Sequence, residues 1–164
     1  MHYTLCIPVR NNQILLGKKT SGFLEGKYNG FGGKIEPGES VYNSAVRELQ
    51  EECDIMPTSM DHVGVIYFDS PNYLETGIMH VFKVTAWEGI PKQIEKMIPQ
   101  WFDNDKIPYD QMCTDDPFWF PLFLEGKTFE AKFKFGEDMI VLEHEVIEKD
   151  LSDIRIHSSI IPHE

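Results

Sequence analysis

Three glutamates, Glu48, Glu51 and Glu52, lie close together in a segment that should form a helix. Because a helix turns by about 100° per residue, Glu48 and Glu52 fall one turn apart on one face, with Glu51 beside them. Like charges one turn apart repel each other, and carboxylates near an apolar face lose hydration. The apolar stripe that they border comprises Val41, Ala45, Leu49 and Cys53. A bound divalent cation would remove both costs, so the pattern indicates a metal site.

The alternative is a solvent-exposed helix face. Glu-rich helices are commonly solvated, and Arg47 with Glu51 could form an ordinary i,i+4 ion pair. The residues before the helix favour the metal site, since Gly32-Gly33 and Pro37-Gly38 create two tight backbone features there, and Ser40 is a suitable N-cap.

The whole arrangement runs from Gly33 through Glu39 to Arg47-Glu48-Leu49-Gln50-Glu51-Glu52 and closes on Ile55. It resembles the signature of the Nudix hydrolases, which cleave nucleoside diphosphates linked to another group. One position departs from the signature, because Asp54 stands where the signature has a glycine. Asp tolerates the left-handed conformation of a helix C-cap better than most residues do, so the resemblance holds.

The resemblance implies a role for each residue of the acidic helix. Magnesium prefers octahedral oxygen coordination and is typically held by a few carboxylates plus substrate phosphates. Glu48, Glu51 and Glu52 would bind Mg²⁺, for which Mn²⁺ can substitute, with the Gly32 carbonyl as a further candidate ligand. Glu52, or another of the three, would activate the attacking water, and Arg47 would orient the glutamates.

Three other stretches resemble the mammalian-type oxidised purine nucleoside triphosphatases within the same superfamily. They are Tyr28-Asn29-Gly30-Phe31-Gly32-Gly33-Lys34, the block from Gln111 to Leu122 that contains Asp115-Asp116-Pro117, and Phe133-Lys134-Phe135. The resemblance extends from about Tyr3 to Glu148. It implies Mg²⁺-dependent hydrolysis of oxidised purine nucleoside triphosphates, such as 8-oxo-dGTP, to the monophosphate and pyrophosphate, which cleans the nucleotide pool.

The same resemblance implies a set of substrate-binding residues. Asn29, Asp115 and Asp116 would recognise the base, and aromatic side chains would close the pocket. The full set is Thr4, Lys19, Phe23, Asn29, Phe31, Gly32, Gly33, Lys34, Phe68, Asp115, Asp116 and Trp119.

The two adjacent aspartates also have a physical rationale. Two neighbouring carboxyls in a buried pocket cannot both ionise cheaply, so one would keep its proton at neutral pH. An acid that can donate or accept can pair with different edges of an altered purine. The alternatives are that Asp116 caps the helix that Pro117 opens, and that Asn29 is a turn residue.

Two departures from this subfamily bear on the site. Cys113 stands where the subfamily has a Trp that stacks on the base; such a stack contributes about 1–3 kcal/mol, so we expect weaker binding or a shifted base preference. A further metal-binding Glu of the subfamily would fall at Lys96, with Glu95 one place away. A slip of one residue in a strand turns a side chain to the opposite face.

Two other functions are considered. One is hydrolysis of another nucleotide, such as a canonical or alkylated purine triphosphate or a nucleotide sugar. The other is a non-catalytic Nudix-like domain that only binds nucleotide, which should have lost acids from the helix; here all three are present.

Composition limits the class of protein and its partners. The 164 residues suit one domain, which we assign to 1–148 with a C-terminal tail over 149–164. No apolar run is long enough for a membrane span, and we expect no membrane partner. The net charge of −12 argues against a nucleic acid polymer and leaves a small-molecule nucleotide as the expected partner. We favour a monomer.

The cysteines indicate a reducing compartment. Cys6, Cys53 and Cys113 are odd in number and widely spaced, which favours free thiols in the cytoplasm. Cys6 and Cys53 should be small core residues.

These residues must be positioned by strands and two helices. The patterns predict strands at 3–10, 13–19, 62–69, 78–85 and 98–103, a glycine-rich loop at 22–33, helices at 40–53 and 116–124, and a closing hairpin at 128–135 and 139–147. The expected fold class is therefore α+β, an α/β/α sandwich of the Nudix type with a mixed β-sheet and two main helices.

Overall fold

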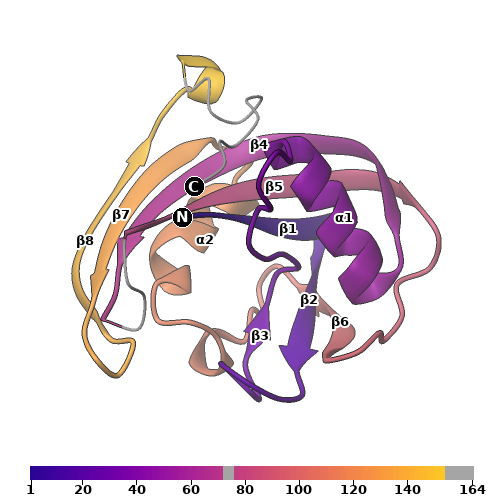
Figure 1. The fold of residues 1–164 in the computed structure, drawn as a ribbon, viewed down its shortest axis with the longest axis horizontal. Helices are drawn as coiled ribbons and strands as arrows, with labels where there is room; N and C mark the ends of the chain where they lie inside the picture. Colours follow the sequence, from indigo (N-terminus) through magenta and orange to yellow (C-terminus); the bar gives the residue numbers. More distant parts are fainter. Residues whose placement is uncertain (72–75, 154–164) are drawn as a thin grey trace.

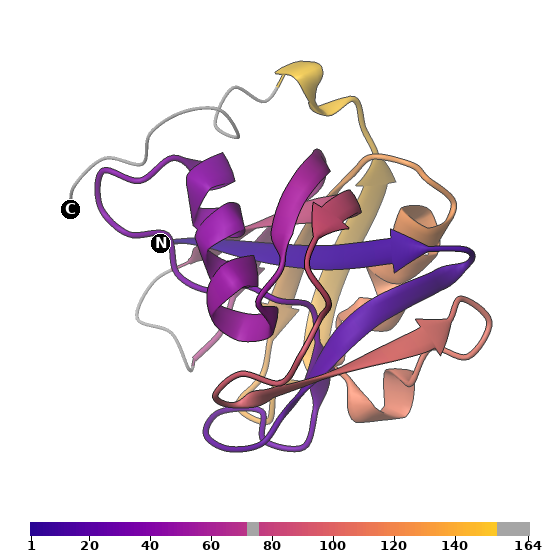
Figure 2. The same ribbon diagram turned by 90° about the vertical axis from the view of Figure 1, so that its right-hand side faces the viewer.

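The structure is a computed structural model and describes residues 1–71 and 76–153. In this part of the chain eight strands form one mixed sheet, in which β1 pairs in parallel with β5 and β4 pairs in parallel with β7. Figures 1 and 2 show the two longer helices on opposite sides of the sheet. The strands are β1 (His2–Arg10), β2 (Gln13–Lys19), β3 (Tyr28–Asn29), β4 (Met56–Asp69), β5 (Gly77–Glu88), β6 (Met97–Asp103), β7 (Phe129–Phe135) and β8 (Val141–Glu148). The helices are α1 (Val41–Cys53) and α2 (Asp116–Leu124), with short 3-10 turns η1 (Tyr109–Gln111) and η2 (Leu151–Asp153).

The strand order is β3-β2-β1-β5-β4-β7-β8, with β6 paired to β2. Side chains alternate along β1, so that Leu5 and Ile7 pack on the side of α2 while Cys6 packs on the side of α1. Each helix thus covers its own hydrophobic cluster. The predicted fold class is confirmed.

Helix α1 has the predicted ends. The Ser40 hydroxyl accepts a hydrogen bond from the Asn43 N–H at 3.0 Å, which satisfies one of the unpaired amides of the first turn. Asp54 ends the helix with φ 58° and ψ 39°, the left-handed conformation that the glycine of the signature would adopt. The substitution at this position therefore preserves the helix end.

Several boundaries differ from the prediction. Strand β4 begins at Met56 rather than at residue 62, because β-bulges between residues 57 and 64 interrupt the alternation that identifies a strand. The predicted loop at 22–33 contains the short strand β3, which pairs with β2. Of the predicted tail, residues 154–164 lie outside the described part.

The predicted core cysteines are confirmed. Cys6 and Cys53 are fully buried, and all three cysteines are free thiols. No helix of the described part is long and apolar enough to cross a membrane.

The loop before α1 lies against β1. Thr4 N–H donates to the Gly33 carbonyl at 2.9 Å, and Ile35 N–H donates to the His2 carbonyl at 2.9 Å. A Cβ on Gly32 would lie 1.8 Å from the Thr4 carbonyl oxygen, so only glycine allows this close approach.

We predict that Gly32→Ala lowers the free energy of unfolding by about 1–3 kcal/mol, because the new methyl group forces the loop away from β1. Urea denaturation would measure the loss. Gly136→Ala is the control: its Cβ would meet Leu142 at an ordinary 3.5 Å, so stability should change by less than about 0.5 kcal/mol. Equal stability of the two variants would contradict the prediction.

Candidate active site

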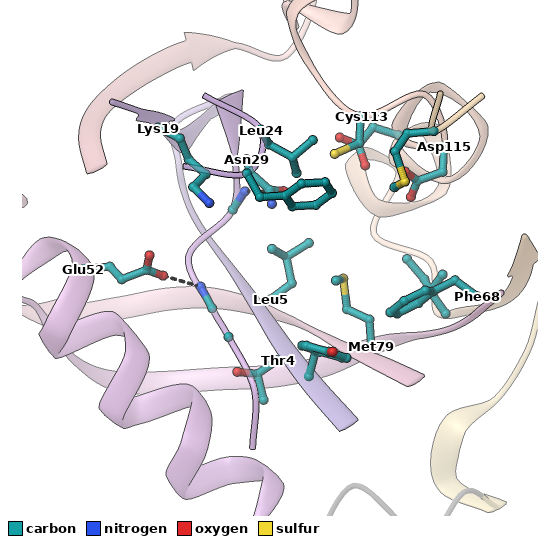
Figure 3. A pocket seen from close by; sticks show the side chains of 18 of the residues that line it. Thr4, Leu5, Lys19, Leu24, Asn29, Glu52, Phe68, Met79, Cys113 and Asp115 are labelled. Carbon is teal, nitrogen blue, oxygen red and sulfur yellow. Dashed lines mark hydrogen bonds between the residues drawn. The ribbon is translucent and has the colours of Figure 1, made fainter. Parts of the chain in front are cut away.

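A cavity of about 210 Å³ opens between the first strands, the start of α2 and the C-terminal half of α1. Figure 3 shows Glu52 at one end and Cys113 with Asp115 at the other. The predicted site residues that line this cavity are Thr4, Lys19, Phe23, Asn29, Gly32, Gly33, Glu52, Phe68, Asp115 and Asp116. The fold therefore gathers residues from across the chain around one space.

Phe31, Trp119 and Lys34 were predicted to bind substrate, but they are not among the described residues that line the cavity. Phe31 is fully buried in the cluster beneath α1, because it alternates with the cavity-lining Gly32. Trp119 is fully buried against Phe129, with ring centroids 5.4 Å apart. It cannot stack on a base in place of the missing Trp. Lys34 is exposed, and its carbonyl accepts a hydrogen bond from Arg47.

The prediction missed several apolar residues that line the cavity. Tyr3 and Met79 face each other across the β1–β5 pairing, a neighbourhood that the sequence alone does not reveal. The missed residues are Tyr3, Leu5, Leu24, Gly30, Ile66, Met79, Met97, Phe135 and Met139. The only usable signal lay in the strands, where alternating apolar residues mark one face of the sheet.

The paired aspartates lie at the start of α2, where Asp116 is buried and Asp115 is half-buried. The Trp119 indole N–H donates to Asp115 Oδ2 at 3.0 Å, whereas Asp116 Oδ2 has no hydrogen-bond partner among the described residues. Burial raises the pKa of both carboxyls, and the neighbouring Asp115 raises the pKa of Asp116 further. Asp116 is therefore the carboxyl that keeps its proton more readily.

The geometry bears on the capping alternative. Asp115, not Asp116, occupies the N-cap position, and its side chain makes no capping hydrogen bond. Asp116 lies within the helix and is 3% exposed. An unpaired buried oxygen has a desolvation cost of about 1–3 kcal/mol, which a ligand hydrogen bond would remove.

Two carboxylates of α1, those of Glu48 and Glu52, are partly desolvated. Burial raises the pKa of Glu52 to about 7, although the Gly32 N–H, which donates to its Oε1 at 2.6 Å, opposes that shift. Burial likewise raises the pKa of Glu48. Glu48 approaches the backbone so closely that a Cβ on Gly33 would lie 2.6 Å from its Oε1. Of the three glutamates predicted to bind metal, Glu52 lines the cavity, whereas Glu48 and Glu51 are not among the described residues that line it.

Arg47 is the cation that offsets part of this charge. Its Nε donates to Glu39 at 2.7 Å, and its Nη1 donates to Glu48 at 3.0 Å and to Glu51 at 3.2 Å. The hydrogen bond from Arg47 holds the pKa of Glu39 below its usual range, and the same bond raises the pKa of Arg47. The predicted role of Arg47 in orienting glutamates agrees with this geometry, and the i,i+4 pair with Glu51 is also present.

The carboxylate oxygens of Glu48, Glu51 and Glu52 are ligands of the type that a hard divalent cation prefers. Within the described residues, no three His, Cys, Asp or Glu side chains are gathered closely enough to hold a metal as they stand. However, Glu48 and Glu51 share one Arg47 nitrogen, and Glu52 is desolvated one turn from Glu48. Burial raises the pKa of Glu48 and of Glu52, and neighbouring carboxylates of this kind are groups that a cation would stabilise.

Of the two positions at which the chain departs from the subfamily, one lies at the cavity and the other does not. Cys113 lines the cavity, and burial raises the pKa of its thiol. Glu95 and Lys96 are exposed, and neither is among the described residues that line the cavity.

The raised pKa of Glu52 predicts a pH-dependent effect of Glu52→Gln in metal-free protein. Between about pH 4.5 and 7 the unfolded chain loses this proton before the folded protein does, so stability falls as pH rises, and the penalty is complete above pH 7. The variant should be more stable than the wild type by about 1–2 kcal/mol at pH 8, and equally stable near pH 4. Urea denaturation in chelator would measure this; a less stable variant at pH 8 would contradict it.

Comparison with known proteins places the chain in a family. A model of the NUDIX domain matches residues 2–123. The chain is 42% identical to the oxidized purine nucleoside triphosphate hydrolase of Danio rerio over 145 residues, 88% of this chain and 93% of the relative. The Mus musculus protein of the same name is 38% identical over 148 residues, 90% of this chain and 95% of the relative. A MutT protein from Bacillus halodurans superposes with a TM-score of 0.78 at 26% identity, covering 88% of this chain and 96% of that one. The chain belongs to the NUDIX family.

Proposed function

We propose that this protein hydrolyses oxidised purine nucleoside triphosphates, such as 8-oxo-dGTP, to the monophosphate and pyrophosphate and so cleans the nucleotide pool. The observation that carries the proposal is a single cavity with an acid pair at one end and the acidic helix at the other. One end suits a base and the other suits phosphates. The names of the Danio rerio and Mus musculus relatives support the same substrate class.

At the base end, Asn29, Asp115 and Asp116 would recognise the purine. Asn29 Oδ1 accepts the Gly30 N–H at 3.0 Å, which orients the side-chain amide N–H groups for a ligand. A pair of acids that shares one proton presents both a donor and an acceptor. It can therefore match a ring edge on which oxidation has altered the order of donors and acceptors.

At the phosphate end, Lys19 and the acids of α1 would act on the triphosphate. Nudix hydrolases generally use divalent metal cations. We propose Mg²⁺ held by Glu48, Glu51 and Glu52, where it would neutralise phosphate charge and acidify a water. Glu52 would take the proton from the attacking water, because its carboxylate lines the cavity and is held there by the Gly32 N–H. Gly32 fixes its carboxylate and Arg47 holds its neighbours.

Cys113 favours a second candidate within the same reaction class. Its small side chain at the base end leaves room for a purine that carries an alkyl group, so an alkylated purine triphosphate is the alternative substrate. The three free thiols support a reducing compartment such as the cytoplasm.

Product analysis with 8-oxo-dGTP and dGTP side by side tests the proposal. We expect Mg²⁺-dependent release of pyrophosphate, faster with 8-oxo-dGTP.

Glu52→Gln should lower kcat by about 10²–10⁴ without unfolding the protein, since the water loses its base. Glu36→Gln is the control and should retain activity, because the Glu36 side chain is 66% exposed and its contact with Arg47, at 3.9 Å, is long for an ion pair. An active Glu52→Gln would overturn the assignment of the base.

Cys113→Trp should tighten binding of 8-oxo-dGTP, because the indole could stack on the base, with a gain of roughly 1–3 kcal/mol. The KM measured beside that of Cys113→Ser, which adds no aromatic surface, would report the gain. Identical KM values in the two variants would mean that the base does not lie against residue 113.

A further inference from the structure

Three residues with bulky or long side chains adopt a left-handed backbone in the described part of the chain. They are Leu24 with φ 66°, Glu95 with φ 52° and Met139 with φ 56°. Such a conformation is common for Gly, Asn and Asp, but for a bulky residue it is an outlier that reflects strain. Leu24 and Met139 both line the cavity, although they belong to loops far apart in the sequence.

Leu24 lies in the loop that connects β2 and β3. The loop is fixed by backbone hydrogen bonds, from the Gly26 N–H to the Lys19 carbonyl at 2.8 Å and from the Lys27 N–H to the Leu24 carbonyl at 3.0 Å. Leu24 belongs to neither core cluster of the described residues, and Figure 3 shows its side chain beside Asn29. Core packing therefore does not explain a leucine at a position that glycine would occupy without strain.

Met139 lies in the turn that connects β7 and β8, and it is held from three directions. Its N–H donates to the Gly136 carbonyl at 3.1 Å, the Thr114 hydroxyl donates to its carbonyl, and the Ser70 hydroxyl donates to its Sδ at 3.4 Å. Thr114 adjoins both Cys113 and Asp115, so the turn is tied to the base end of the cavity.

We propose that Leu24 and Met139 are binding residues that hold the apolar face of the purine ring, an inference that rests on the proposed function. Strained residues persist where surrounding structure fixes them, and they are concentrated at ligand sites. The polar groups of Asn29, Asp115 and Asp116 can pair only with the edge of the ring. Its two faces need apolar contacts, and a flexible methionine can adapt to rings of different shape.

Leu24→Gly and Met139→Gly test this inference. Each should raise the Kd of 8-oxo-dGMP about tenfold, measured by calorimetry, because apolar contact with the ring is lost. Leu24→Gly should leave Tm unchanged or raise it, since glycine adopts a positive φ without strain and Leu24 belongs to neither core cluster of the described residues. Met139 packs against the core cluster on the side of α2, so for Met139→Gly the Kd alone tests the inference. A merely structural role predicts the opposite pattern, with a lower Tm and an unchanged Kd, and that result would overturn the inference.

Glu95→Gly is the matched control. It removes the same kind of backbone strain at an exposed residue, so it should leave the Kd of 8-oxo-dGMP unchanged.

Turnover of 8-oxo-dGTP by the wild type separates this inference from the proposed function. If the wild type binds 8-oxo-dGMP, weaker binding by the two cavity variants supports the inference even without turnover, in which case only the proposed function fails. Equal binding by all variants overturns the inference even if turnover is observed. A wild type that neither binds nor hydrolyses overturns both.

Discussion

The site depends on how negative charge is held against a half-buried helix face. Glu48 and Glu52 lie beside the apolar stripe of α1, where burial raises the pKa of each. Two protein groups make this arrangement tolerable, the Arg47 guanidinium and the Gly32 N–H. Arg47 does not neutralise both carboxylates, because it also pairs with Glu39 and Glu51. The Glu52 carboxylate lines the cavity, where a cation and the phosphates that it carries would offset its charge.

At the opposite end of the cavity, the hydrogen bonds of the Asp115–Asp116 pair are only partly satisfied by the protein. The Trp119 indole is buried in the aromatic cluster and points its N–H at Asp115, so one acid of the pair is satisfied by the protein. Asp116 Oδ2 has no hydrogen-bond partner among the described residues. The cavity therefore has a partly desolvated carboxylate, Glu52, at one end and an unpaired carboxyl oxygen, Asp116 Oδ2, at the other. A nucleotide bound with a cation can meet both at once.

Local patterns predicted what depends on local interactions. The Ser40 cap, the left-handed Asp54 and the Arg47–Glu51 pair all lie within one helix and its ends, and each is present. The start of β4 was missed, because bulges disturb its alternation. Phe31 and Trp119 were misplaced, since the face that a side chain presents depends on pairing between distant segments. Leu24 and Met139 had no local signal, because their loops take conformations that their residue types disfavour.

The parallel pairing of β1 with β5 has a consequence for the order of assembly. His2 lies in register with Ile78, and Tyr3 lies opposite Met79 on the cavity wall. Contacts between such distant segments slow folding, because a long loop must close before they form. During synthesis, the acidic helix is complete well before β5 has emerged to fix β1 beneath the Gly32 loop. Glu48 and Glu52 should therefore become buried, and their pKa values raised, only late, when the central strands pair.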